Sequence, residues 1–100
     1  MGRSHDLEQL RSILKQQMPH LRECYGVKSL GLFGSRVRGD ANADSDLDIL
    51  LSFKEVPGLL RLVELENQLS DLLGLRVDLA LADCLKPNIG KQILSELVPL

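Results

Sequence analysis

The feature that constrains this chain most is a short segment in which apolar and polar side chains alternate. Residues 46–53 read DLDILLSF. Because successive side chains of a β-strand point to opposite faces, this segment predicts a strand with one buried face and one polar face. The apolar row consists of Leu47, Ile49, Leu51 and Phe53. Asp46, Asp48 and Ser52 lie on the opposite face, which also receives Leu50.

Two further segments have the composition of strands. Residues 75–81 read LRVDLAL and alternate in the same way, so that Asp78 lies on the face opposite the apolar row. That apolar row consists of Leu75, Val77, Leu79 and Leu81. Residues 27–33, VKSLGLF, have a composition that suits a short strand. We therefore expect a small sheet in which two strands carry aspartates.

The N-terminal segment has the spacing of an amphipathic helix. Between Asp6 and Glu23, leucine and methionine recur at steps of three and four residues, which places them on one helical face. Pro19 lies inside this pattern, and a proline removes a backbone hydrogen bond and clashes with the preceding turn. We therefore expect a kink or a break near Met18, and a cap from Ser4 or Asp6 at the start of the helix.

Two more helices are expected further along the chain. The Pro-Gly pair at 57–58 breaks the chain and opens a leucine-rich helix that runs to Leu73, with Gly74 as its C-terminal cap. Its expected core stripe consists of Leu59, Leu62, Leu65, Leu69, Leu72 and Leu73. Pro87 precedes a short last helix over residues 88–97.

This order of elements, α-β-β-α-β-α, predicts the fold class. It fits an α/β (α+β) domain of two layers, in which helices pack on one face of a small mixed sheet. At 100 residues the chain is expected to form a single domain over residues 1–100.

Composition excludes several classes of protein. Net charge is −2 and aromatic residues make up 3% of the chain, which argues against a dedicated nucleic-acid-binding protein. No apolar run reaches the roughly 18 residues that a membrane-spanning helix needs. The two cysteines, Cys24 and Cys84, are too few for a disulfide scaffold or a zinc cluster. We therefore expect a protein of the reducing cytoplasm, with no membrane and no direct nucleic-acid contact.

The aspartates on the polar faces of the two strands suggest chemistry. Asp46 and Asp48 lie on one strand and Asp78 on the other, so that the three side chains can converge on one site. Carboxylates packed together repel one another unless a cation is present. Their oxygen atoms suit Mg²⁺ or Mn²⁺, and two such ions about 3.5–4 Å apart are the usual clamp for phosphoryl chemistry.

The segment between the first two strands has features of a phosphate-binding loop. Gly34 permits close approach of the backbone, and the Ser35 hydroxyl can hold phosphate oxygens. Arg36 and Arg38 follow at once and could pair with phosphates, although either could equally be ordinary surface charge. Gly39 permits a tight turn.

Taken together, residues 32–53 carry a recognisable pattern. Gly34-Ser35 and the pair Asp46 and Asp48 are separated by ten residues, 36–45. This G-S-x10-D-x-D arrangement, followed by a later strand aspartate, resembles the signature of the nucleotidyltransferase superfamily typified by DNA polymerase beta. The short chain and the SDLDILLSF context resemble its minimal branch, the MNT-type proteins, which are often antitoxins partnered with HEPN toxins.

The resemblance implies roles for the matching residues. Gly34 and Ser35 would hold the β- and γ-phosphates of a nucleoside triphosphate. The implied nucleotide-binding set is Gly34, Ser35, Arg36 and Ser45. The implied catalytic and metal-binding set is Asp46, Asp48 and Asp78, with two Mg²⁺ ions expected and Mn²⁺ as an alternative. The resemblance further implies AMP transfer from ATP to a tyrosine of a HEPN toxin, which disarms the toxin.

Other readings of the sequence predict different functions. A non-catalytic module with the same fold would neutralise its partner by surface contact alone, without need of the carboxylates. Haloacid-dehalogenase phosphatases also have a D-x-D motif, but their aspartates end a buried strand, whereas Asp46 begins one. Glycosyltransferases, aminoglycoside-modifying relatives and template-directed polymerases are longer chains. Because this chain has little beyond a catalytic core, a toxin partner or a second copy is expected to complete the site.

Overall fold

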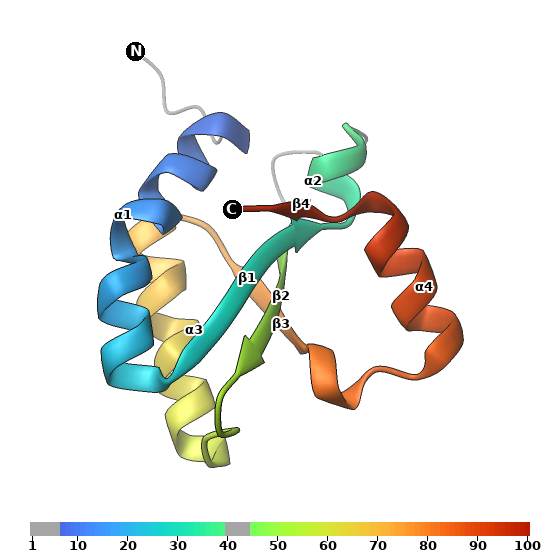
Figure 1. Cartoon of the computed structure of the whole chain (residues 1–100). Helices are drawn as coiled ribbons and strands as arrows, with labels where there is room; N and C mark the ends of the chain where they lie inside the picture. The colour runs from blue at the N-terminus through green and yellow to red at the C-terminus, as the bar shows by residue number, and fades with distance from the viewer. Residues whose placement is uncertain (1–6, 40–44) are drawn as a thin grey trace.

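The computed structural model describes residues 7–39 and 45–100, and shows a mixed arrangement of helices and strands (Figure 1). In chain order the elements are α1 (Leu7–Tyr25), β1 (Val27–Phe33), α2 (Ser35–Arg38), β2 (Leu47–Phe53), α3 (Leu59–Leu73), β3 (Val77–Leu81), the 3-10 turn η1 (Ala82–Cys84), α4 (Pro87–Glu96) and β4 (Val98–Pro99). The three predicted strands and three predicted helices are confirmed. The short elements α2, η1 and β4 were not predicted.

The strands form one four-stranded mixed sheet in the order β3-β2-β1-β4. Strand β1 pairs antiparallel with β2 and with β4, while β2 pairs parallel with β3. A parallel pair needs a long crossover connection, and α3 supplies it. The small mixed sheet expected from the sequence is therefore confirmed, and β3 lies at its edge.

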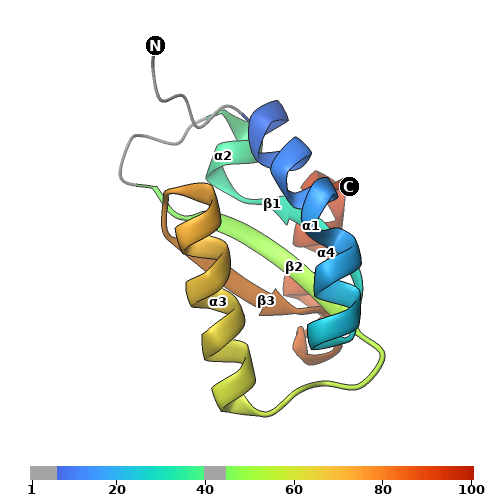
Figure 2. The ribbon, with the colours of Figure 1, turned by 90° about the vertical axis from the view of Figure 1, so that its left-hand side faces the viewer.

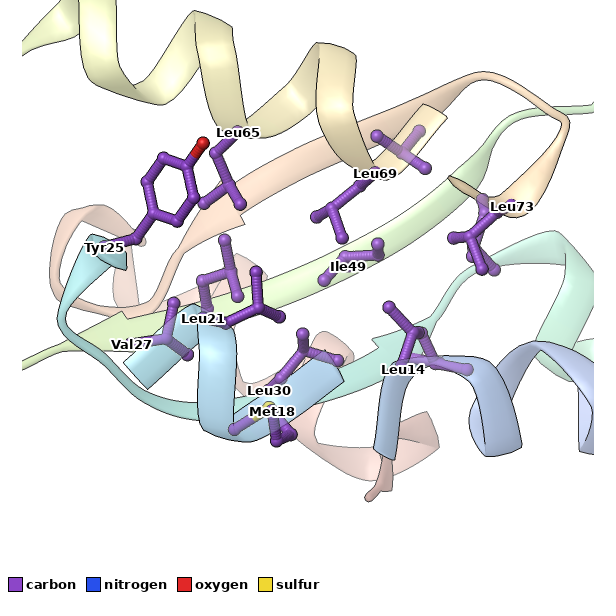
Figure 3. Packing of buried hydrophobic residues seen from close by; sticks show 14 of the residues in the cluster. Leu14, Met18, Leu21, Tyr25, Val27, Leu30, Ile49, Leu65, Leu69 and Leu73 are labelled. Carbon is purple, nitrogen blue, oxygen red and sulfur yellow. The ribbon is translucent and has the colours of Figure 1, made fainter. Parts of the chain in front are cut away.

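The main hydrophobic core lies between the sheet and the two long helices (Figure 3). Strand β2 contributes the apolar row predicted from its alternation, and the exposed fraction of Leu47, Ile49 and Leu51 is 0%. Helices α1 and α3 cover this face of the sheet, as Figure 2 shows. The buried residues of α1 are Leu10, Leu14, Met18, Leu21 and Tyr25. The alternation along β2 thus determines which of its side chains enter this core and which lie on the other face of the sheet.

The C-terminal helix departs from the predicted packing on one face. Figures 1 and 2 place α4 on the opposite side of the sheet from α1 and α3. Ile93 of α4 and Leu50 of β2 are buried, yet they lie outside the main core cluster. A Cβ added to Gly31 of β1 would come within 2.7 Å of Leu97, which directly follows α4. The expectation of helices on one face therefore holds for the two long helices only, since α4 lies on the other face and Leu97, directly after it, packs on Gly31.

Of the kink or break expected near Met18, the break is wrong, because α1 continues through Pro19 to Tyr25. A proline removes one intrahelical hydrogen bond, whereas the residues on both sides of it remain packed on the sheet. Pro19 itself is exposed. The proposed caps, Ser4 and Asp6, lie outside the described residues.

The expected core stripe of α3 is too broad. Leu65, Leu69 and Leu73 are buried, but Leu59 is 76% exposed and Leu72 is 37% exposed. Spacing in three and four residues spreads six leucines over a wide arc, and the small sheet buries only its centre. None of the helices within residues 7–39 and 45–100 is both long enough and apolar enough to cross a lipid bilayer.

Candidate active site

The three predicted aspartates lie at neighbouring positions on β2 and β3. Asp48 and Asp78 are register partners across the parallel pair, and each is the second residue of its strand. Neighbouring strands lie about 4.8 Å apart, so the two side chains emerge side by side on the same face. Asp46 precedes β2 by one residue and is exposed, as is Asp78. The buried partners Leu47 and Val77 point the other way, into the core.

The electrostatics of Asp48 show that negative charge gathers at this point. The pKa of the Asp48 carboxyl lies above its ordinary value, first because burial disfavours its charged form. The carboxylates of Asp78 and Asp46 raise the pKa further, and that of Glu96 adds a smaller increase. The guanidinium of Arg38 acts in the opposite direction. Asp48 is therefore close enough to both Asp78 and Asp46 for their charges to act on it.

A cavity of about 310 Å³ opens beside Asp48. Its lining consists of Phe33, Gly34, Ser35, Arg38, Asp48, Ile89, Gln92, Ile93 and Glu96. The wall is thus built from the end of β1, the turn into α2, the start of β2 and one face of α4. The predicted Gly-Ser pair and one predicted aspartate share this cavity.

Gly34 is fitted tightly against Asp48. Its backbone has φ +89° and ψ −161°, a conformation that is essentially restricted to glycine. A Cβ at this position would overlap Oδ2 of Asp48 and lie 2.9 Å from its Cγ. The backbone of the loop and the carboxylate of β2 therefore approach as closely as the absence of a side chain allows.

Two arginines of α2 have different surroundings. Arg36 donates hydrogen bonds from Nε and Nη2 to the Ser45 carbonyl oxygen, at 3.1 and 2.7 Å. Arg38 lines the cavity, and its Nη1 lies 3.1 Å from each carboxylate oxygen of Glu96. Arg36 therefore joins the described ends of the loop to one another, whereas Arg38 faces the site. Residues 40–44 of the predicted loop lie outside the described residues.

The contribution of α4 to the site was missed. Glu96, Gln92 and Ile89 line the cavity, although they lie more than 40 positions beyond Asp48 in the sequence. No local motif marks them, because they are ordinary positions of an amphipathic helix. The close packing of Leu97 on Gly31 brings them to the site, and this contact depends on the tertiary fold.

The donor set suits a hard divalent cation. Within residues 7–39 and 45–100, no three His, Cys, Asp or Glu side chains form a ready cage for a metal ion. Mg²⁺ does not require one, since it is usually held by one or two carboxylates together with water and substrate phosphates. The adjacent carboxylates of Asp48 and Asp78, whose mutual repulsion a cation would relieve, match that requirement.

Comparison with known proteins assigns this arrangement to a family. Residues 7–100 match the nucleotidyltransferase domain family. The protein adenylyltransferase MntA of Thermococcus cleftensis is 52% identical over 92 residues, which are 92% of this chain and 93% of that protein. A solved minimal nucleotidyltransferase is 39% identical, with a TM-score of 0.80 over 99% of this chain and 100% of that one.

A more distant structure shares the fold. It is a chain of the complex between the tri-AMPylated HEPN toxin of Shewanella oneidensis and its MNT antitoxin, with a TM-score of 0.66 at 19% identity. The alignment covers 90% of this chain and 70% of that one. The family match over nearly the whole chain and the 52% identical relative together show that this protein is an enzyme of the nucleotidyltransferase family, in its minimal form.

Proposed function

We propose that this protein is a Mg²⁺-dependent protein adenylyltransferase that moves AMP from ATP to a tyrosine of a HEPN toxin. The observation that carries the proposal is the pairing of Asp48 with Asp78, beside a cavity that Gly34 and Ser35 also line. The 52% identical relative is named a protein adenylyltransferase, and the match covers most of both chains. The sequence signature and the relative thus support the same reaction class.

The residues of the cavity would bind the triphosphate. The backbone of Gly34 and the hydroxyl of Ser35 would contact the β- and γ-phosphates, and the Arg38 guanidinium would add positive charge. Arg36 and Ser45 would contribute to nucleotide binding by holding the two ends of the loop together. These groups orient the triphosphate, so that the α-phosphorus faces the attacking oxygen.

The aspartates would bind the metal ions, and one of them would accept the proton of the acceptor hydroxyl. Asp46, Asp48 and Asp78 would be the ligands of two Mg²⁺ ions, which when bound supply positive charge for the oxygens on which negative charge builds. The acceptor oxygen would form a bond to the α-phosphorus while the bond to pyrophosphate breaks. Asp78 is exposed on the edge strand β3, where it can take the proton of an incoming hydroxyl.

An acceptor hydroxyl from another protein fits this architecture. Strand β3 is at the edge of the sheet, and the side chain of Asp78 is exposed there, so a large acceptor can approach from solvent. We infer that the acceptor belongs to a HEPN toxin and that its modification is the antitoxin activity. Cys24 and Cys84 are both exposed free thiols, which fits the cytoplasm as the place of action.

A second candidate function is neutralisation by contact alone. Leu59 and Leu60 at the start of α3 are 76% and 82% exposed, and Leu94 of α4 is 64% exposed. Exposed apolar side chains of this size favour a protein partner. Such binding would need neither ATP nor the aspartates, so the two functions can be separated by experiment.

The test is transfer of label from ATP carrying radioactive phosphorus at the α-position. The wild-type chain is incubated with Mg²⁺ and a purified HEPN toxin, and both proteins are examined by gel and by intact mass. Asp48→Asn should lose nearly all transfer, whereas Asp71→Asn, the same change on the exposed surface of α3, should transfer at the wild-type rate. Toxin that is neutralised equally well by Asp48→Asn would favour contact alone.

A further inference from the structure

A carboxylate of the chain itself occupies the groups that are proposed to bind phosphate. The backbone N–H of Gly34 donates to Oε1 of Glu96 at 3.0 Å. The Nη1 of Arg38 lies 3.1 Å from both Oε1 and Oε2 of Glu96, in an ion pair whose glutamate side chain is only 18% exposed. Figure 1 shows the C-terminal end of α4 beside α2, where this contact forms.

The position is electrostatically poor for a glutamate, except for these two partners. Glu96 is the last residue of α4, where the helix dipole disfavours negative charge. Its carboxylate is also near enough to Asp48 to act on it repulsively. The contacts from Gly34 and Arg38 therefore account for the placement of this half-buried carboxylate.

We propose that Glu96 is an internal competitor of the nucleotide, which must release Gly34 and Arg38 before the triphosphate can use them. This inference rests on the proposed function, because it assumes that the cavity receives a triphosphate. The Gly34 amide has a single hydrogen, so it can serve Glu96 or a phosphate oxygen but not both fully. The exchange is chemically balanced, since one anionic oxygen replaces another on the same donors.

The packing around Glu96 indicates that its side chain moves and its backbone stays. Ile93, one turn earlier in α4, is buried, and Leu97 packs on Gly31 of β1. Strand β4 then pairs with β1 at Gly31 and Leu32. With the backbone fixed on both sides, rotation of the Glu96 side chain is the available route of release.

The decisive measurement is nucleotide affinity by calorimetry with Mg²⁺. Glu96→Gln keeps the shape of the side chain and removes its charge, so we expect it to bind ATP about tenfold more tightly, the worth of one charge-assisted hydrogen bond. Inorganic tripolyphosphate should gain in the same way, whereas adenosine should not. Glu64→Gln is the matched control, since Glu64 pairs with Arg61 on the exposed side of α3 and its change should leave affinity unaltered.

Two further readouts keep the result unambiguous. In wild-type protein the Gly34 amide resonance should shift when tripolyphosphate is added, and in Glu96→Gln it should be displaced before any addition. Glu96→Asp withdraws the carboxylate by one methylene, so its affinity for ATP should lie between those of the wild type and Glu96→Gln. If Glu96→Gln does not fold, the affinity of Glu96→Asp is the test.

The outcomes separate this inference from the proposed function. A Glu96→Gln affinity equal to or weaker than that of the wild type overturns the competitor role, even where label transfer proceeds. Wild-type protein that transfers label and gains affinity on loss of the Glu96 charge supports both. Absence of ATP binding in the wild type and in both Glu96 variants overturns both.

Discussion

Replacing Gly34 with alanine tests whether the close approach of the Gly34 backbone to the Asp48 carboxylate is needed for activity. The backbone at Gly34 lies at φ +89° and ψ −161°, and a residue with a Cβ held there costs on the order of 1–3 kcal/mol. The new Cβ would also overlap Oδ2 of Asp48, so that this side chain must rotate away. The substitution should therefore affect stability and activity through separate causes.

Gly26→Ala supplies the matched control. Gly26 also has a positive φ, +72°, but a Cβ there would meet nothing within 4 Å. Its expected cost is the backbone term alone, about 1–2 kcal/mol. For a chain of this size each kcal/mol lowers Tm by roughly 4–8 °C. Both variants should thus unfold at lower temperature, and Gly34→Ala at a temperature equal to or below that of Gly26→Ala.

The assay compares thermal unfolding with label transfer at a temperature where both variants are folded. Gly34→Ala should lose nearly all transfer, because Asp48 no longer stands beside Asp78, whereas Gly26→Ala should transfer at the wild-type rate. Wild-type transfer by a folded Gly34→Ala, or an equal loss in both variants, would refute the reasoning.

Three other perturbations have defined outcomes. Asp48→Asn should raise Tm at neutral pH, because the pKa of Asp48 is raised above 3.8 in the folded chain and its ionisation therefore opposes folding. This rise in Tm should shrink as pH falls below the ordinary carboxyl pKa, because wild-type Asp48 is then protonated in both the folded and the unfolded chain. Melting curves over a pH series would contradict the reasoning if the rise in Tm grew at low pH. Leu69→Ala should cost about 2–5 kcal/mol in urea unfolding, since Leu69 is fully buried and its truncation leaves a cavity; the exposed Leu60→Ala should cost far less. Chelation of Mg²⁺ with EDTA should stop label transfer and leave the melting temperature near that of the apoprotein, and transfer that survives chelation would contradict the assignment of the aspartates as metal ligands.

The parts of the fold that follow from local periodicity could be predicted. Alternation over residues 46–53 gave the strand, its buried row and the polar face of Asp48, because a period of two has one structural solution. The spacing of leucines gave α3, although the arc that is buried depends on the width of the sheet, so Leu59 and Leu72 were misplaced. Helix α2 has only four residues, which is too short for any period to show.

The convergence of the aspartates was expected, chiefly through the family resemblance, but the strand pairing behind it does not follow from local sequence patterns. Alternation places Asp48 and Asp78 on polar faces, but only the parallel register makes them neighbours. Glu96 carries no sequence signal, since its contact with Gly34 requires α4 to cross the opposite face of the sheet. For the same reason the sequence does not show that Arg36 donates to the Ser45 carbonyl oxygen whereas Arg38 contacts Glu96.

Gly31 shows how a position remote from the chemistry can govern it. Its backbone has no positive φ, so the need for glycine there is a need for space: a methyl group would push against Leu97 at 2.7 Å. The residue before Leu97 is Glu96, and its carboxylate holds the turn that faces Asp48. A single carbon added in the middle of β1 would therefore displace Leu97 and, through the adjacent Glu96, the loop that is proposed to bind the nucleotide. Gly31 lies away from the aspartates, but on this reasoning its substitution would change the affinity for the nucleotide.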